Sequence, residues 1–190
     1  PLIIVKSGEG DVYWPAFSLN SIGDMIPGQG YQIKMENLTI FSYPPLAPRF
    51  GYDIKTKPIH FITTTKTNQN MTVGLPINTW INTPNFGDEI GAFDSHGQLI
   101  GSAVYTNNHL AITVWGDDIL SPEKNGAKEG EKITFVLWNS LTNTEEKLSF
   151  QWRQGSEYYI QNGISITESI INSNPIKSNQ LISRSDILGR

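Results

Sequence analysis

Five acidic residues have side chains and spacing that could hold a cation. Asp88, Glu89 and Asp94 flank one segment that alternates apolar and polar side chains, and Asp117 and Asp118 follow another. Calcium takes oxygen ligands from carboxylates, carbonyls and amides, and the loops around these acids are rich in Asp and Asn. The sequence therefore allows a Ca²⁺ site at these residues, although it has no EF-hand or RTX-type spacing.

Two other roles for the same acids stay open. Two carboxylates on separate strands could form the acid and base pair of a glycosidase, which requires a defined separation and a shifted pKa. Alternatively, Asp side chains at strand ends accept hydrogen bonds from nearby backbone N–H groups and form Asx turns. We expect the turn-forming role, because it needs nothing beyond the local sequence.

No other pattern in the sequence points to catalysis. The sequence has no Gly-x-Ser-x-Gly elbow, no Ser-x-x-Lys arrangement and no HExxH cluster, and it contains no cysteine. His60, His96 and His109 show no spacing typical of a catalytic triad, and we expect them at strand edges or in turns. Gly28 and Gly30 precede a predicted strand instead of opening a helix, which is the wrong context for a phosphate-binding loop. The sequence therefore predicts that the chain is not an enzyme.

Three tryptophans are candidates for ligand binding. A sugar-binding module stacks exposed aromatic rings on its ligand beside polar groups. Trp80 lies in the irregular stretch INTWINTPN, and Trp115 and Trp138 have the opposite parity from the predicted core residues of their strands. These three rings could face a ligand. Packing in the core or in an interface is the alternative for each of them.

The elements that position these residues are predicted to be strands. Charged residues make up only 17% of the chain and aromatic residues reach 11%, while Asn, Thr, Ser, Gly and Pro fill the connections. Apolar alternation predicts strands at 12–14, 31–35, 38–41, 59–64, 71–75, 89–93, 98–106, 109–115, 132–138, 147–152 and 157–160. Residues 18–25 could form one short helical turn. This pattern predicts an all-β fold, an antiparallel β-sandwich of Ig-like or jelly-roll-like type with little helix.

The most distinct local unit is a β-hairpin at residues 87–105. The turn residues Asp94-Ser95-His96-Gly97 separate two strand-like runs there. In the strands that follow, a period of two places one set of apolar side chains on a common face. The predicted core consists of Leu110, Ile112, Val114, Ile133, Phe135, Leu137, Leu148, Phe150 and Trp152.

Several long strings carry a resemblance to a known group of proteins. NMTVGLPINTW (70–80), GDEIGAFDSHGQLIGSAVY (87–105), LAITVWGDD (110–118) and GEKITFVLWNSLTNTEE (130–146) resemble a repeat-region module near the C-termini of large secreted Bacteroidota proteins. VYWPAFSLNSIGDMIPGQGYQIKM (12–35) is similar to the closing part of a preceding module, and SNPIKSNQLISRSDILGR (173–190) resembles the start of a type IX secretion sorting domain. A sorting domain normally continues for several strands beyond such a string, and this chain ends at Arg190.

The resemblance implies a division of the chain into four parts. Residues 1–45 would be a partial β module, 46–57 a proline-rich linker or crossover, 58–168 the main β-sandwich, and 169–190 a linker with the start of a sorting-domain-like segment. It further implies export by the type IX system and a location outside the cell or on its outer surface.

The function expected from these observations is that of a non-enzymatic structural or adhesive module. It would act through contacts with sister modules or a protein partner, and the partners include further copies of the chain in a homo-oligomer. The alternative is a carbohydrate-binding module attached to an exported enzyme, with a polysaccharide as partner. Nucleic acid is not an expected partner, because the net charge is −4 and the basic residues are scattered. No apolar run is long enough to predict a membrane span.

Overall fold

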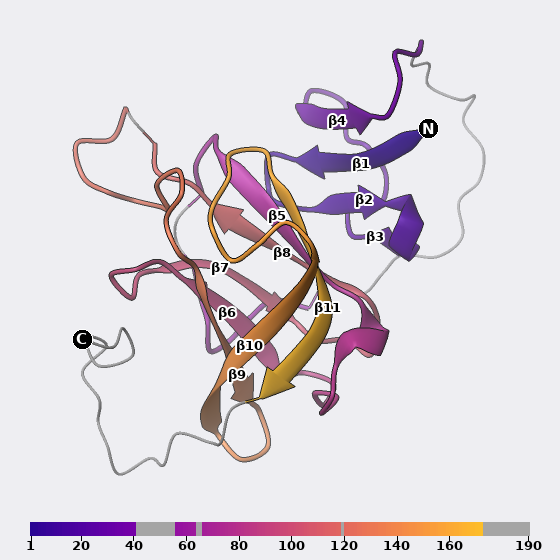
Figure 1. The fold of residues 1–190 in the computed structure, drawn as a ribbon. Coiled ribbons are helices and arrows are strands. Elements are labelled where there is room, and N and C mark those ends of the chain that lie inside the picture. The colour runs from indigo at the N-terminus through magenta and orange to yellow at the C-terminus, as the bar shows by residue number, and fades with distance from the viewer. Residues whose placement is uncertain (41–55, 64–65, 119, 173–190) are drawn as a thin grey trace. The chain divides into compact units, whose positions relative to one another are not determined.

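The computed structural model describes residues 1–40, 56–63, 66–118 and 120–172, and these form an all-β protein (Figure 1). The chain divides into two compact units, Pro1–Lys55 and Thr56–Arg190. In the described residues, helix is limited to two 3-10 turns, η1 (Pro15–Phe17) and η2 (Ile77–Thr79). The helical turn expected at 18–25 does not form. Most of the expected linker, 46–57, and the sorting-domain-like string, 173–190, lie outside the described residues.

The first unit contains a four-stranded sheet with the order β3-β2-β1-β4. The strands are β1 (Leu2–Ser7), β2 (Val12–Trp14), β3 (Leu19–Asn20) and β4 (Tyr31–Met35), and all pairs are antiparallel. The turn between β1 and β2 is held by Ser7, whose Oγ accepts hydrogen bonds from the N–H groups of Glu9 and Asp11. The apolar run that begins β1 pairs with β4, and within this run Val5 also pairs with Tyr13 of β2.

The second unit contains a seven-stranded sheet with the order β7-β6-β9-β10-β11-β5-β8. Its strands are β5 (Asn70–Leu75), β6 (Glu89–Phe93), β7 (Leu99–Val104), β8 (Leu110–Trp115), β9 (Thr134–Asn139), β10 (Thr144–Gln154) and β11 (Ile164–Asn172). All pairs are antiparallel except β5 with β11. The last strand continues past residue 168, where the main module was expected to end. The strands expected at 38–41 and 59–64 do not form in their described residues.

The seven strands curl into the two layers of a β-sandwich. β7 and β8 stand at opposite ends of the strand order, yet a Cβ added at Gly101 of β7 would lie 2.3 Å from the backbone oxygen of Thr113 in β8. The strand β10 bends along its length, because its register with β11 shifts on both sides of Trp152. The antiparallel sandwich predicted from the sequence is confirmed, and the β6–β7 hairpin forms as expected.

The core of the second unit lies between these layers and follows the predicted period of two. Six of the nine predicted core residues are buried: Ile112, Val114, Ile133, Phe135, Leu137 and Leu148. Leu110, Phe150 and Trp152 pack against this core and are partly exposed. A second apolar cluster contains Phe61, Val136 and Trp138. Strand β9 is therefore covered on both faces, with Phe135 and Leu137 on one and Val136 and Trp138 on the other.

Candidate functional site

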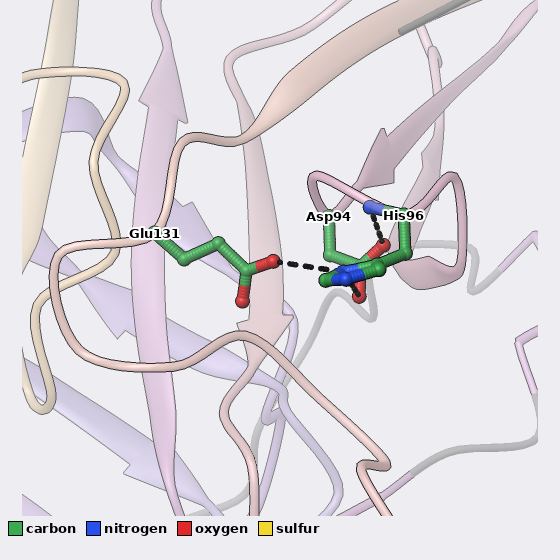
Figure 2. Close-up of side chains that lie close together, drawn as sticks. All are labelled: Asp94, His96 and Glu131. Atoms are coloured by element: carbon green, nitrogen blue, oxygen red, sulfur yellow. Dashed lines mark hydrogen bonds and ion pairs between the residues drawn. The ribbon is translucent and has the colours of Figure 1, made fainter. Parts of the chain in front are cut away.

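The hairpin turn between β6 and β7 fixes the carboxylate of Asp94. Its Oδ1 accepts the backbone N–H of His96 at 2.9 Å and that of Gln98 at 2.8 Å. Gly97 adopts a φ of 78°, and its N–H donates to the carbonyl of Asp94 at 3.1 Å. Asp94 is completely buried. The local turn chemistry thus holds this carboxylate with two backbone donors on one oxygen, of which Figure 2 shows the donor from His96.

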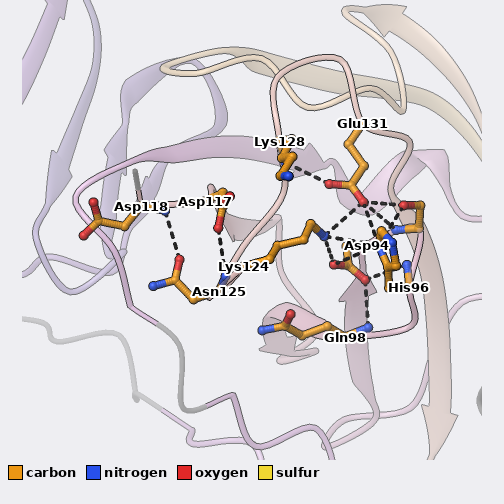
Figure 3. A network of polar contacts seen from close by, with 10 residues as sticks. Asp94, His96, Gln98, Asp117, Asp118, Lys124, Asn125, Lys128 and Glu131 are labelled. Atoms are coloured by element: carbon orange, nitrogen blue, oxygen red, sulfur yellow. Dashed lines mark hydrogen bonds and ion pairs between the residues drawn. The ribbon is translucent and has the colours of Figure 1, made fainter. Parts of the chain in front are cut away.

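The second oxygen of Asp94 meets a lysine from a distant loop. Lys124 lies in the long connection between β8 and β9, and its Nζ contacts Asp94 Oδ2 directly and Glu131 Oε1 at 3.1 Å. The side chains of Lys124, Asp94 and Glu131 are 20%, 0% and 10% exposed. Figure 3 shows the ammonium group between the two carboxylates. The site is therefore an ion-pair triad assembled from two loops around the buried carboxylate of Asp94.

Glu131 is the most heavily bonded member of this triad. Its Oε2 accepts the N–H of Lys128 at 2.8 Å, and its Oε1 accepts the Ser95 hydroxyl and, at 3.2 Å, the Ser95 N–H. Burial alone would raise the pKa of Glu131, but the hydrogen bonds from Ser95, Lys128 and Lys124 and the charge of Lys124 lower it to about 2. Burial alone would lower the pKa of Lys124, but its hydrogen bonds to Asp94 and Glu131 and their charges raise it. Lys124 and Glu131 are therefore both charged at neutral pH.

Asp94, His96 and Glu131 also form a group of the kind that can ligate a metal ion. Their potential ligand atoms all lie within 4.8 Å of one another. His96 is largely exposed, with Nδ1 at 3.5 Å from Glu131 Oε1. The ammonium of Lys124 already contacts both carboxylates, so a metal cation would have to displace it. Of the five acids proposed for calcium, Asp94 alone belongs to this group among the described residues.

Asp117 and Asp118 organise the loop that carries Lys124 (Figure 3). Asp117 Oδ1 accepts the N–H of Asn125 at 2.8 Å, and Asn125 Oδ1 accepts the N–H of Asp118 at 2.9 Å. Asp118 Oδ1 accepts the N–H of Leu120 at 2.9 Å. Both aspartates therefore have the turn-forming role expected from the sequence.

Asp88 and Glu89 join separate parts of the chain. Asp88 Oδ1 accepts the N–H and the hydroxyl of Ser140, both at 2.9 Å, and its Oδ2 accepts the N–H of Asn85 at 2.8 Å. Glu89 accepts the backbone N–H groups of residues 59–61 at 2.6 to 3.1 Å. Both side chains are buried, with backbone donors directed at both oxygens of each carboxylate. The five predicted acids thus do not gather around one cation.

The three tryptophans predicted as ligand platforms are buried, and that prediction is wrong. Trp80, Trp115 and Trp138 are 8%, 3% and 8% exposed. Trp80 packs edge-on against Tyr105, and the ring of Trp138 stacks on His60 with centroids 4.6 Å apart. For Trp138 the parity argument failed because β9 is covered on both faces. A ring with so little exposed area cannot serve as a stacking surface for a sugar.

Sequence reasoning missed Lys124 and Glu131 altogether. They belong to a loop rich in charged residues, and no local spacing marks them as partners of Asp94. The three histidines have different partners. His60 Nε2 contacts Glu145, His96 lies beside the triad, and His109 Nδ1 accepts the N–H of Ile77.

The fold and the site define an all-β sandwich protein with a partly buried Lys-Asp-Glu triad in its loops. Comparisons with protein-family models, with curated proteins and with solved structures find no match for this chain. The described residues include no helix with the length and apolar character needed to cross a membrane.

Proposed function

We propose that the chain is a non-enzymatic structural or adhesive module of an extracellular or cell-surface protein, and that it acts through contacts of its surface with sister modules. The observation that carries this proposal is the use of its acidic side chains. Asp88, Glu89, Asp117 and Asp118 all accept backbone N–H groups, and this role in stabilising the chain supports a structural use of these acids.

An apolar surface at one end of the second unit supports the same proposal. Phe86 and Leu141 are 57% and 79% exposed and lie on two different loops. Asp88 joins these loops, because it bonds to Asn85 on one side and to Ser140 on the other. Ile81, on the same loop as Phe86, is 62% exposed. Exposed apolar side chains that gather into one patch mark surfaces that contact another protein.

The location outside the cell rests on the resemblance of 70–80, 87–105, 110–118 and 130–146 to modules of secreted Bacteroidota proteins.

The alternative, a carbohydrate-binding module, is less well supported. Its three candidate rings are buried, so such a module would have to bind its polysaccharide through other residues.

The test is self-association of the full chain, measured by sedimentation velocity over a concentration series. We expect the wild type to form dimers or larger species at high concentration. The double substitution Phe86→Ser with Leu141→Ser should abolish this, while Leu120→Ser, which changes another exposed apolar residue, should not.

A parallel assay on a panel of polysaccharides tests the absence of catalysis. Turnover by the wild type that disappears in Glu131→Gln, while circular dichroism shows that the variant is still folded at the assay temperature, would show that the chain is an enzyme. Self-association that persists unchanged in the double variant would show that this apolar surface is not the contact.

A further inference from the structure

We propose that the side chains of Lys124 and Asp94 become joined by an intramolecular isopeptide bond, which the folded chain forms without another enzyme. The bond links Lys124 Nζ to Asp94 Cγ, and one carboxylate oxygen leaves as water. Glu131 is the proton-transfer group. The structure holds the three side chains in the arrangement that precedes this bond (Figure 3).

The first argument is position. Lys124 Nζ contacts Asp94 Oδ2, and Asp94 cannot turn away because Oδ1 is fixed by the N–H groups of His96 and Gln98. Lys124 is 30 residues from Asp94 in the sequence, and folding alone brings the two together. Holding an amine against a carboxyl carbon in a fixed geometry replaces an encounter in solution by an intramolecular step.

The second argument is burial. Asp94 is fully buried and the Lys124 side chain is 20% exposed, so the carboxylate has lost its water and the ammonium group has lost part of its water. Desolvation disfavours charged groups, and a proton transfer within the pair converts ammonium and carboxylate into a neutral amine and a carboxylic acid. The charged pair remains the dominant form, because the pKa of Lys124 is raised. A minor neutral form is sufficient, since each chain reacts once and the product accumulates.

The third argument is the set of groups around the reacting carbon. The amine adds to Asp94 Cγ, and negative charge develops on Oδ1. The N–H groups of His96 and Gln98 already donate to that oxygen and stabilise the charge in the manner of an oxyanion hole. Glu131 Oε1, at 3.1 Å from Lys124 Nζ, takes a proton from the attacking nitrogen.

The same proton then completes the reaction. Glu131 returns it to the leaving oxygen, which departs as water with the electron pair of its bond to carbon. Ammonium plus carboxylate gives amide plus water, and Glu131 is unchanged. The step needs no oxidant, reductant or cofactor.

The experiment is the intact mass of the full chain, purified and measured under denaturing conditions. We expect a mass lower than the sequence mass by one water molecule. Lys124→Arg keeps the positive charge but removes the amine nucleophile, and it should have its full sequence mass. A wild-type mass equal to the sequence mass would overturn the proposal, and the triad would then be a buried ion pair only.

Two further measurements identify the bond. Cyclisation of Asp94 onto the following backbone nitrogen also releases water, but it does not need Lys124. A water loss that persists in Lys124→Arg would therefore overturn the proposal. In a tryptic digest of the wild type, a branched peptide should join the segment that contains Asp94 to the segment that contains Lys124. Glu131→Gln preserves the size of the side chain, but the amide cannot take up and return the proton. We therefore expect this variant to have its full sequence mass.

Discussion

The carboxylate of Glu89 lies 2.8 Å from the backbone N–H of Phe61, and this contact attaches a segment without strand structure to β6. The ring of Phe61 then packs with Val136 and Trp138 and covers the second face of β9. One buried carboxylate thus completes an apolar cluster, because it satisfies the N–H groups of a backbone that has no sheet partner.

Glu89→Gln should lower the free energy of unfolding by about 1 to 3 kcal/mol, because the new amide NH₂ faces backbone donors and leaves them unsatisfied. The measurement is urea denaturation followed by tryptophan fluorescence. Glu123→Gln, at an exposed glutamate, is the matched control and should have the wild-type midpoint. Equal midpoints for both variants would contradict the role assigned to Glu89.

Gly101→Ala should destabilise the second unit by about 1 to 3 kcal/mol or more, since the methyl group would collide with the backbone of Thr113. Gly8→Ala, where no atom lies within 4 Å of the added Cβ, is the control. Thermal unfolding by circular dichroism measures both. If Gly101→Ala melts like the wild type, β7 and β8 do not pack as closely as described.

Acid should remove the contribution of Glu131 to stability. Its pKa of about 2 is below the ordinary value of 4.5, so its stabilising effect is fully present above pH 4.5 and is lost as the pH falls towards about 2. The difference in unfolding free energy between wild type and Glu131→Gln should therefore shrink across this window. The pKa of Glu131 is lowered with or without the isopeptide bond, because Ser95 and Lys128 still donate hydrogen bonds to its carboxylate. A constant difference at all pH values would contradict it.

Asp117→Ala should lower the free energy of unfolding by about 1 kcal/mol through loss of the hydrogen bond to Asn125, whereas Asp117→Asn keeps an acceptor and should be nearly neutral. The melting temperature measured with and without Ca²⁺ distinguishes a turn from a metal site. For a turn, Ca²⁺ changes nothing in any variant. A Ca²⁺-dependent rise in the wild type that both substitutions abolish would establish a calcium site instead.

The parts of the fold that depend on residues close together in the sequence were predictable. The hairpin at 87–105 followed from its turn residues, and the inward side chains of β8, β9 and β10 followed from a period of two. The burial of Trp138 was not predictable, because what covers it includes Phe61, from a segment that forms no strand. The triad was not predictable for the same reason: 30 residues separate Asp94 from Lys124, and only the folded loops bring them together.

The parallel pairing of β5 with β11 has a mechanical consequence. β5 is the first strand of the second unit and β11 is its last described strand, and the register joins Ile164 to Thr72 and Ile166 to Gly74. A pull on the two ends of this unit would draw the two strands past each other along their length. Their hydrogen bonds would then be loaded together in shear instead of opening one after another. A module placed in series with others along a stretched chain would resist extension through this pair of strands.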